Sequence, residues 1–177
     1  MKAVMISIQP KWVEKIANGE KTIEVRKTAP KIGTPFKCYV YATKSGDRII
    51  LKNDKVYEIS KSLTGKVVGE FICDKIIDEF SVEHLTPYGL KCTCLTKDEL
   101  NAYLGNKDGY GWHISDIKIY DKPKEISEFK RECDGYCFTP SKVCIKVKNK
   151  QSDVWANCNR LLTLTRPPQS WQYVEEL

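Results

Sequence analysis

Short runs of alternating hydrophobic and polar residues recur along the chain, and this period of two predicts β-strands. Residues 22–26 show the pattern clearly, because Ile23 and Val25 point to one side of the predicted strand and the polar residues point to the other. Gly69 predicts a bulge inside a longer strand. The other predicted strands cover residues 3–8, 36–43, 48–51, 56–59 and 66–77, a segment after Gly109, and two pieces of the tail on either side of Pro167-Pro168.

Two segments have the signals of helices. Residues 10–18 begin with Pro10, which suits a first helical turn, and Gly19 provides the stop. Three apolar residues fall on one face of this helix: Trp12, Val13 and Ile16. A second helix follows Thr96, which together with Glu99 forms a capping-box pattern. Many short strands with two short helices favour a small mixed barrel over a parallel α/β sheet.

The length and composition fit one domain that buries a core. The chain has 177 residues, of which 41% are hydrophobic and 29% charged. We therefore expect a single α+β domain over residues 1–177, with a cysteine-containing insertion at about 130–160.

The net charge and the absence of targeting signals limit which partners and which cellular location we expect. The formal net charge is +6, a mild basic bias that favours an anionic partner without demanding one. The first residues lack the long apolar region of a signal peptide, and no stretch approaches the ~20 apolar residues of a membrane span. We expect a cytoplasmic protein with no membrane association, whose eight cysteines are thiols or metal ligands.

A cluster of charged residues near the first predicted helix is the main candidate site. Glu24 and Arg26 share one face of their strand, and Lys21 enters from the junction between helix and strand. Arginine offers a fork of donors to a phosphate or a base edge, and a glutamate can accept from an exocyclic amine. The alternative is an ordinary ion pair on a solvated face, which contributes only ~0–1 kcal/mol.

The segment around these residues resembles the ASCH domain. Gly19, Lys21, Glu24 and Arg26 occupy the fixed positions of a pattern G-x-K-x-x-E-x-R that members of this family carry. The runs from Gly111 to Ser115 and from Arg166 to Trp171 also look like elements of phage-type or bacterial ASCH proteins. The resemblance covers residues 1–125 and 161–175, and it implies a PUA-like β-barrel with a cleft between the barrel and the early helix.

The resemblance implies a cleft that binds RNA, another single-stranded nucleic acid or a nucleotide, with no cofactor required. The ligand-binding residues expected there are Gln9, Lys21, Glu24, Arg26, Trp112 and Ser115. Trp112 could stack on a base, or it could be a core aromatic that closes the barrel. The sequence does not predict an oligomeric state.

A hydrolase is the alternative function. Some ASCH proteins deacetylate N4-acetylcytidine, and others are ribonucleases, so Lys21 as base and Glu24 as proton shuttle would be the catalytic pair. The amidohydrolase pattern has a threonine two residues before the arginine. Glu24 stands at that position here, so the nucleophile is missing. His113 has no serine, cysteine or aspartate partner at a recognisable spacing and is interpreted as structural.

Four cysteines in the expected insertion suggest a structural zinc site. Cys133, Cys137, Cys144 and Cys158 supply enough thiolates for tetrahedral coordination. The alternative for Cys144 is a small buried residue in an alternating strand. Nearby lysines on one strand face, Lys146, Lys148 and Lys150, could extend a phosphate-binding track or simply form a solvated edge.

Overall fold

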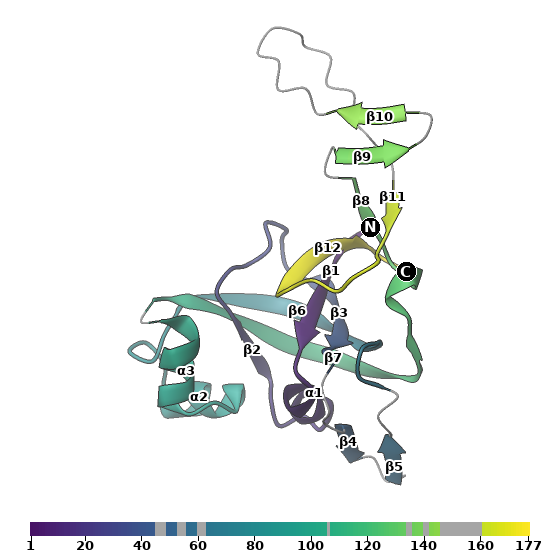
Figure 1. The fold of residues 1–177 in the computed structure, drawn as a ribbon. Helices are drawn as coiled ribbons and strands as arrows, with labels where there is room; N and C mark the ends of the chain where they lie inside the picture. Colours follow the sequence, from purple (N-terminus) through teal and green to yellow (C-terminus); the bar gives the residue numbers. More distant parts are fainter. Residues whose placement is uncertain are drawn as a thin grey trace, which may run out of the picture.

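The computed structural model describes residues 1–44, 49–52, 56–59, 63–105, 107–133, 136–139, 142–145 and 161–177 (Figure 1). Its central feature is a six-stranded sheet in the order β12-β1-β3-β6-β7-β2. Its strands are β1 (Lys2–Ile8), β2 (Ile23–Arg26), β3 (Phe36–Ala42), β6 (Val67–Phe80), β7 (Gly109–Lys124) and β12 (Trp171–Glu175). Among the described strands of this sheet, only β1 and β3 run parallel, and the other neighbours are antiparallel.

The sheet is open, which corrects the expected barrel. Strands β12 and β2 are the two ends of the strand order, and no pairing joins them among the described residues. The fold class is therefore mixed α+β with a mostly antiparallel sheet. Sequence alternation predicts which strands form, but closure depends on pairing between strands that lie far apart in the chain, and local pattern does not encode that.

Both faces of the central strands are covered. In β1, Val4, Ile6 and Ile8 contribute to one core cluster, whereas Ala3 and Met5 contribute to another on the opposite face. This arrangement follows from the period of two, which sends successive side chains to opposite faces.

The two longest strands, β6 and β7, pair along most of their length. Their register shifts between Val67 and Gly69, in agreement with the bulge predicted at Gly69. A Cβ on Gly69 would lie 2.5 Å from the backbone oxygen of Lys118, so the close approach of the two strands requires glycine here.

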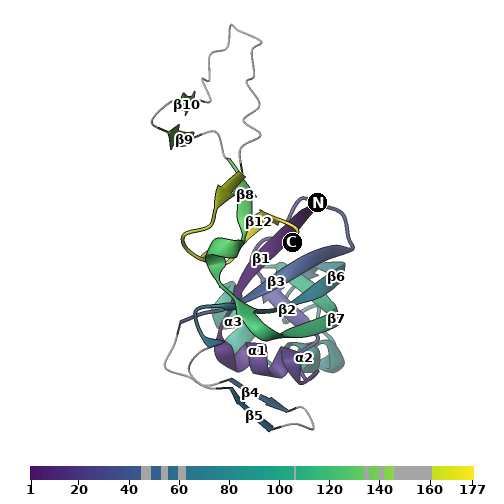
Figure 2. The same cartoon turned by 90° about the vertical axis from the view of Figure 1, so that its right-hand side faces the viewer.

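In the part of the chain that the structure describes, three α-helices pack around the sheet. Helix α1 (Pro10–Ala17) begins with the predicted proline and ends before Gly19, which adopts a left-handed φ of 72°. Helix α3 (Lys97–Leu104) has the predicted capping box at Thr96. Helix α2 (Pro87–Thr93) was not predicted; it is only seven residues long, and Thr86 caps it. Figures 1 and 2 show α2 and α3 lying together near one end of the sheet.

Three two-stranded sheets and a short 3-10 helix complete the described fold. They pair β4 (Ile49–Lys52) with β5 (Val56–Ile59), β8 (Lys130–Glu132) with β11 (Leu161–Thr163), and β9 (Tyr136–Thr139) with β10 (Lys142–Ile145), and the 3-10 helix spans Ile126–Glu128. Because β8 pairs with β11, the two ends of the segment between them, residues 133–160, start from neighbouring strands. Much of the expected insertion lies outside the described residues, so its boundaries stay a prediction. No helix among the described residues is long and apolar enough to cross a bilayer.

Candidate functional site

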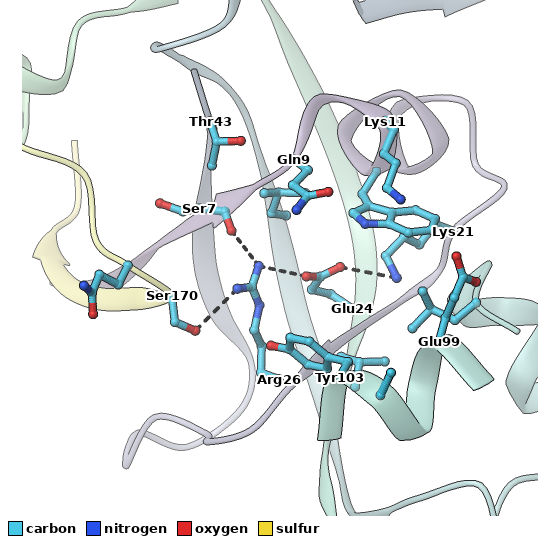
Figure 3. Close-up of a pocket in the computed structure, with 16 residues that line it drawn as sticks. Ser7, Gln9, Lys11, Lys21, Glu24, Arg26, Thr43, Glu99, Tyr103 and Ser170 are labelled. Atoms are coloured by element: carbon cyan, nitrogen blue, oxygen red, sulfur yellow. Dashed lines mark hydrogen bonds and ion pairs between the residues drawn. The ribbon is translucent and has the colours of Figure 1, made fainter. Parts of the chain in front are cut away.

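The three charged residues predicted as a site lie together in one pocket of about 510 Å³ (Figure 3). Lys21, Glu24 and Arg26 all line this pocket, and they are only 3%, 6% and 7% exposed. The pocket lies where the end of β1 and the start of α1 meet β2, α3 and the residues just before β12. The solvated ion pair weighed as an alternative is therefore wrong for this chain.

Glu24 is held between the two cations. Its Oε1 lies 2.8 Å from Nη2 of Arg26, and its Oε2 lies 3.3 Å from Nζ of Lys21. The two oxygens of one carboxylate thus face one cation each. A carboxylate has about four lone-pair positions, so Glu24 keeps capacity to accept a further hydrogen bond from a ligand.

The ammonium of Lys21 is fixed by the backbone of two elements. It donates to the carbonyl oxygen of Ile23 at 2.8 Å and to that of Thr93 at 2.7 Å. Together with Glu24 these acceptors match the three donors of an ammonium group. The C-terminal end of α2 therefore helps to position Lys21, although α2 has no sequence signal that linked it to the site.

Arg26 connects β2 to the opposite end of the sheet. Its Nη2 donates to the backbone oxygen of Ser7 at 2.7 Å, and its Nη1 donates to Oγ of Ser170 at 3.4 Å. Its Nε is buried and makes no hydrogen bond to a described residue. The guanidinium is thereby oriented by Ser7, Ser170 and Glu24, and its Nε–H remains a buried donor for a ligand.

The local sequence explains why these side chains enter the pocket. Ile23 and Val25 pack with Phe80, Leu100 and Leu104 in a separate core cluster. Burial of this apolar face fixes the strand orientation, so the alternate residues Glu24 and Arg26 must point to the other side.

Two aromatic residues that sequence reasoning did not assign to the site also line the pocket: Trp12 and Tyr103. The ammonium groups of Lys11 and Lys21 lie 4.4 and 5.4 Å from the centroid of the Trp12 ring. Burial raises the pKa of the Tyr103 phenol, and the nearby Arg26 acts in the opposite direction. The helical spacing of Trp12 suggested only a core role, and the place of Tyr103 depends on the packing of α3 against β2.

Of three further residues expected at the site, the structure places one in the pocket and two elsewhere. Gln9 lines the pocket, as expected. Trp112 is completely buried in the main core, 5.9 Å from Trp171 between ring centroids, and it does not line the pocket. Ser115 also lies outside the pocket and donates to the backbone oxygen of Ile72. Trp112 is therefore a core aromatic, as the second of the two interpretations had it. Its side chain is fully buried in the core cluster and has no exposed face on which a base could stack.

His113 has a partner that its sequence context did not reveal. Its Nδ1 lies 2.6 Å from Oδ1 of Asp74, on the neighbouring strand β6. Pairing of antiparallel strands brought these residues together across 39 positions of sequence. His113 and Asp74 do not line the pocket.

The predicted zinc site is not tested by the structure. Across the described residues, no group of three or more potential ligands is placed to hold a metal ion. The backbone pairs Cys137 with Cys144 across β9 and β10. The side chains of these two residues and the whole of Cys158 lie outside the described part, so the four-cysteine site stays a prediction.

The fold and the pocket define a small α+β domain with a buried charge cluster, and the comparisons identify its family. A model of the ASCH domain matches residues 6–134, well over half of the chain. The chain therefore belongs to the ASCH domain family, as its G-x-K-x-x-E-x-R segment indicated.

Solved structures of ASCH from Zymomonas mobilis share this fold. One matches with a TM-score of 0.60 and 17% identity, covering 98% of this chain and 88% of that chain. A serine-to-alanine variant of that protein matches with a TM-score of 0.60 and 15% identity, over 98% of this chain and 89% of that chain. A tyrosine-to-phenylalanine variant matches with a TM-score of 0.54 and 18% identity, over 71% and 77%. A search of curated proteins found no match.

Proposed function

We propose that this protein binds RNA or a nucleotide in the cleft lined by Lys21, Glu24 and Arg26. The observation that carries the proposal is a buried carboxylate fixed between two cations in an open pocket. Desolvation offsets much of the attraction in a buried ion pair, so such a cluster contributes little net stability. Its position in a cleft supports a role in recognition. ASCH domains are in general thought to bind RNA.

The chemistry of the pocket suits a nucleobase. Glu24 offers a fixed acceptor for an exocyclic amine, and Arg26 holds a further buried donor beside it. Trp12 and Tyr103 supply aromatic surface on which a base could stack, a contact that contributes about 1–3 kcal/mol per base. Lys11, at the pocket and exposed, would pair with a phosphate.

The same geometry supports binding over hydrolysis. A lysine acting as a base needs a free lone pair, but Nζ of Lys21 already faces three oxygen acceptors, two of them backbone carbonyls. Glu24 is likewise engaged on both oxygens. Two hydroxyls that line the pocket are engaged elsewhere: Oγ of Ser7 donates to the backbone oxygen of Pro168, and Oγ of Ser170 accepts from Arg26.

Binding is tested by titrating the protein with random-sequence RNA oligomers and with nucleoside monophosphates, monitored by tryptophan fluorescence. We expect binding by the wild type and a loss of about 1–3 kcal/mol in Trp12→Ala. Lys11→Gln should weaken RNA binding and reduce the salt dependence by about 0.7 in the logarithmic slope. Lys118→Gln is the matched control, since this exposed lysine on β7 lies outside the pocket. Absence of binding to every RNA and nucleotide would overturn the proposal.

Hydrolysis is tested in parallel with N4-acetylcytidine and RNA as substrates. We expect no product from either. Turnover that disappears in Lys21→Ala would replace the binding function with the hydrolase alternative.

A further inference from the structure

A second pocket, of about 690 Å³, lies along β11, the residues that follow it, and β12. Its polar lining is rich in hydrogen-bond donors: the guanidinium groups of Arg131 and Arg166, the amide of Gln172, and the hydroxyls of Thr163 and Thr165. None of the described residues that line it carries a carboxylate, so its formal charge is positive.

Two of these donors are available to a ligand. The Nε2 atom of Gln172 is buried and makes no hydrogen bond to a described residue. Arg166 is exposed and forms no ion pair with the described part of the chain. The neighbouring carboxylate of Glu132 lines an adjacent pocket and lies 3.2 Å from the ammonium of Lys2. An arginine fork beside amide and hydroxyl donors is the arrangement that recognises phosphate.

The two pockets are connected by one short, well-anchored segment. The backbone N–H of Leu164 donates to the oxygen of Phe129 at 2.9 Å, and Oγ of Ser7 donates to the oxygen of Pro168 at 2.7 Å. Pro167 and Pro168 have restricted backbone φ angles, which stiffens the segment further. Arg166 is thus held at a set position relative to Ser170, which lines the first cleft (Figure 3).

The spacing of the two pockets suits a strand of nucleic acid. Arg166 and Ser170 are four residues apart, so their Cα atoms are separated by at most roughly 14 Å. Stacked nucleotides advance about 3.4 Å along each strand, so at most about four of them are needed to span this separation, and fewer if the strand is extended.

We infer that Arg131, Arg166 and Gln172 form a second site that binds a backbone phosphate of a single-stranded nucleic acid whose base occupies the cleft at Glu24. This inference rests on the proposed function and makes it more specific, because it assigns a strand rather than a free mononucleotide as the ligand. The base would be recognised in the first cleft, and the second pocket would add affinity and direction along the strand.

A length series tests the inference. Random-sequence RNA oligomers of one to eight nucleotides are titrated against the full chain and followed by tryptophan fluorescence, with inorganic phosphate as a separate probe. We expect affinity to rise by about tenfold once the oligomer reaches about four nucleotides, which corresponds to one added charged contact. Arg166→Gln should remove this step and lower the salt slope for the longer oligomers by about 0.7. It should leave mononucleotide binding unchanged, and Lys118→Gln should leave the step intact.

The outcomes separate this inference from the proposed function. Mononucleotide binding without a length step, or a step that survives in Arg166→Gln, overturns the second site and leaves the first cleft in place. Equal weakening of mononucleotide and oligomer binding in Arg166→Gln also overturns it, because the pocket would then hold the phosphate of the nucleotide itself or of a free anion. Failure of every oligomer and mononucleotide to bind overturns the proposed function as well.

Discussion

Arg26 on β2 donates a 2.7 Å hydrogen bond to the backbone oxygen of Ser7 on β1, and this contact links two strands of the described sheet that do not pair directly with each other. The same guanidinium pairs with Glu24 and reaches Ser170 beside β12. Arg26 therefore connects β2, at one edge of the open sheet, to β1 and to Ser170 beside β12. It also orients the carboxylate of Glu24, the acceptor in the cleft. A single residue serves both the fold and the site.

Replacing Arg26 by lysine should destabilise the protein although the charge is kept. An ammonium lacks the planar fork that reaches Ser7 and Glu24 together. We expect the free energy of unfolding to fall by about 1.5–3 kcal/mol, the range for a hydrogen bond to a charged group. Urea denaturation measures this change. Arg166→Lys is the control, because Arg166 is exposed, and it should change stability by less than about 0.5 kcal/mol. Equal effects of the two variants would contradict the structural role of Arg26.

Replacing Glu24 by glutamine should have a larger effect. The substitution keeps the shape of the side chain but leaves Lys21 and Arg26 buried without their shared counter-charge. Removing one partner of a buried ion pair typically destabilises by about 3–5 kcal/mol, and we expect a loss in that range. Denaturation followed by circular dichroism gives the value. A stability equal to that of the wild type would show that the cluster is well solvated, contrary to its burial.

Because β6 and β7 approach each other closely, replacing Gly69 by alanine should lower stability far more than replacing Gly33 by alanine. In Gly69→Ala the new Cβ would meet the backbone oxygen of Lys118 at 2.5 Å, and the backbone cannot move aside as a flexible side chain can. We expect a loss of about 1–3 kcal/mol in the free energy of unfolding. A Cβ on Gly33 meets nothing within 4 Å, so Gly33→Ala should change stability by less than about 0.5 kcal/mol. Thermal unfolding of the two variants side by side checks the prediction, which fails if Gly69→Ala is the more stable.

The pair between Asp74 and His113 predicts a pH-dependent contribution to stability. The hydrogen bond with His113 lowers the pKa of the Asp74 carboxyl in the folded state. A carboxyl with a lowered pKa stabilises the fold above its unfolded pKa, which is about 3.9, and loses that contribution as the pH falls through the folded pKa.

Because both side chains are more than 40% exposed, we expect Asp74→Asn to lower stability by only ~0–1 kcal/mol at pH 7. Urea unfolding at pH 7, 5 and 3 measures the difference between wild type and variant. The difference should shrink towards pH 3. A difference that stays constant over this range would exclude the carboxylate form of Asp74 as its source.

The sequence by itself determined the six strands of the main sheet, helices α1 and α3, and the charged face of β2. Alternation of Ile23 and Val25 with Glu24 and Arg26 is a local signal, and the direction of each side chain follows from it directly. The capping box at Thr96 and the stop at Gly19 are equally local. The ASCH motif lies in this same stretch, which is why the family could be identified before the fold was known.

Only the tertiary structure decided that the sheet is open, that Trp112 belongs to the core, and that Trp12 and Tyr103 line the cleft. It also placed Arg26 against Ser170, which is 144 residues away in the chain. These relationships depend on which strands pair and how the helices pack over them. Burial and long-range hydrogen bonds set that arrangement, whereas the spacing of residues along the chain records only the local geometry of each element.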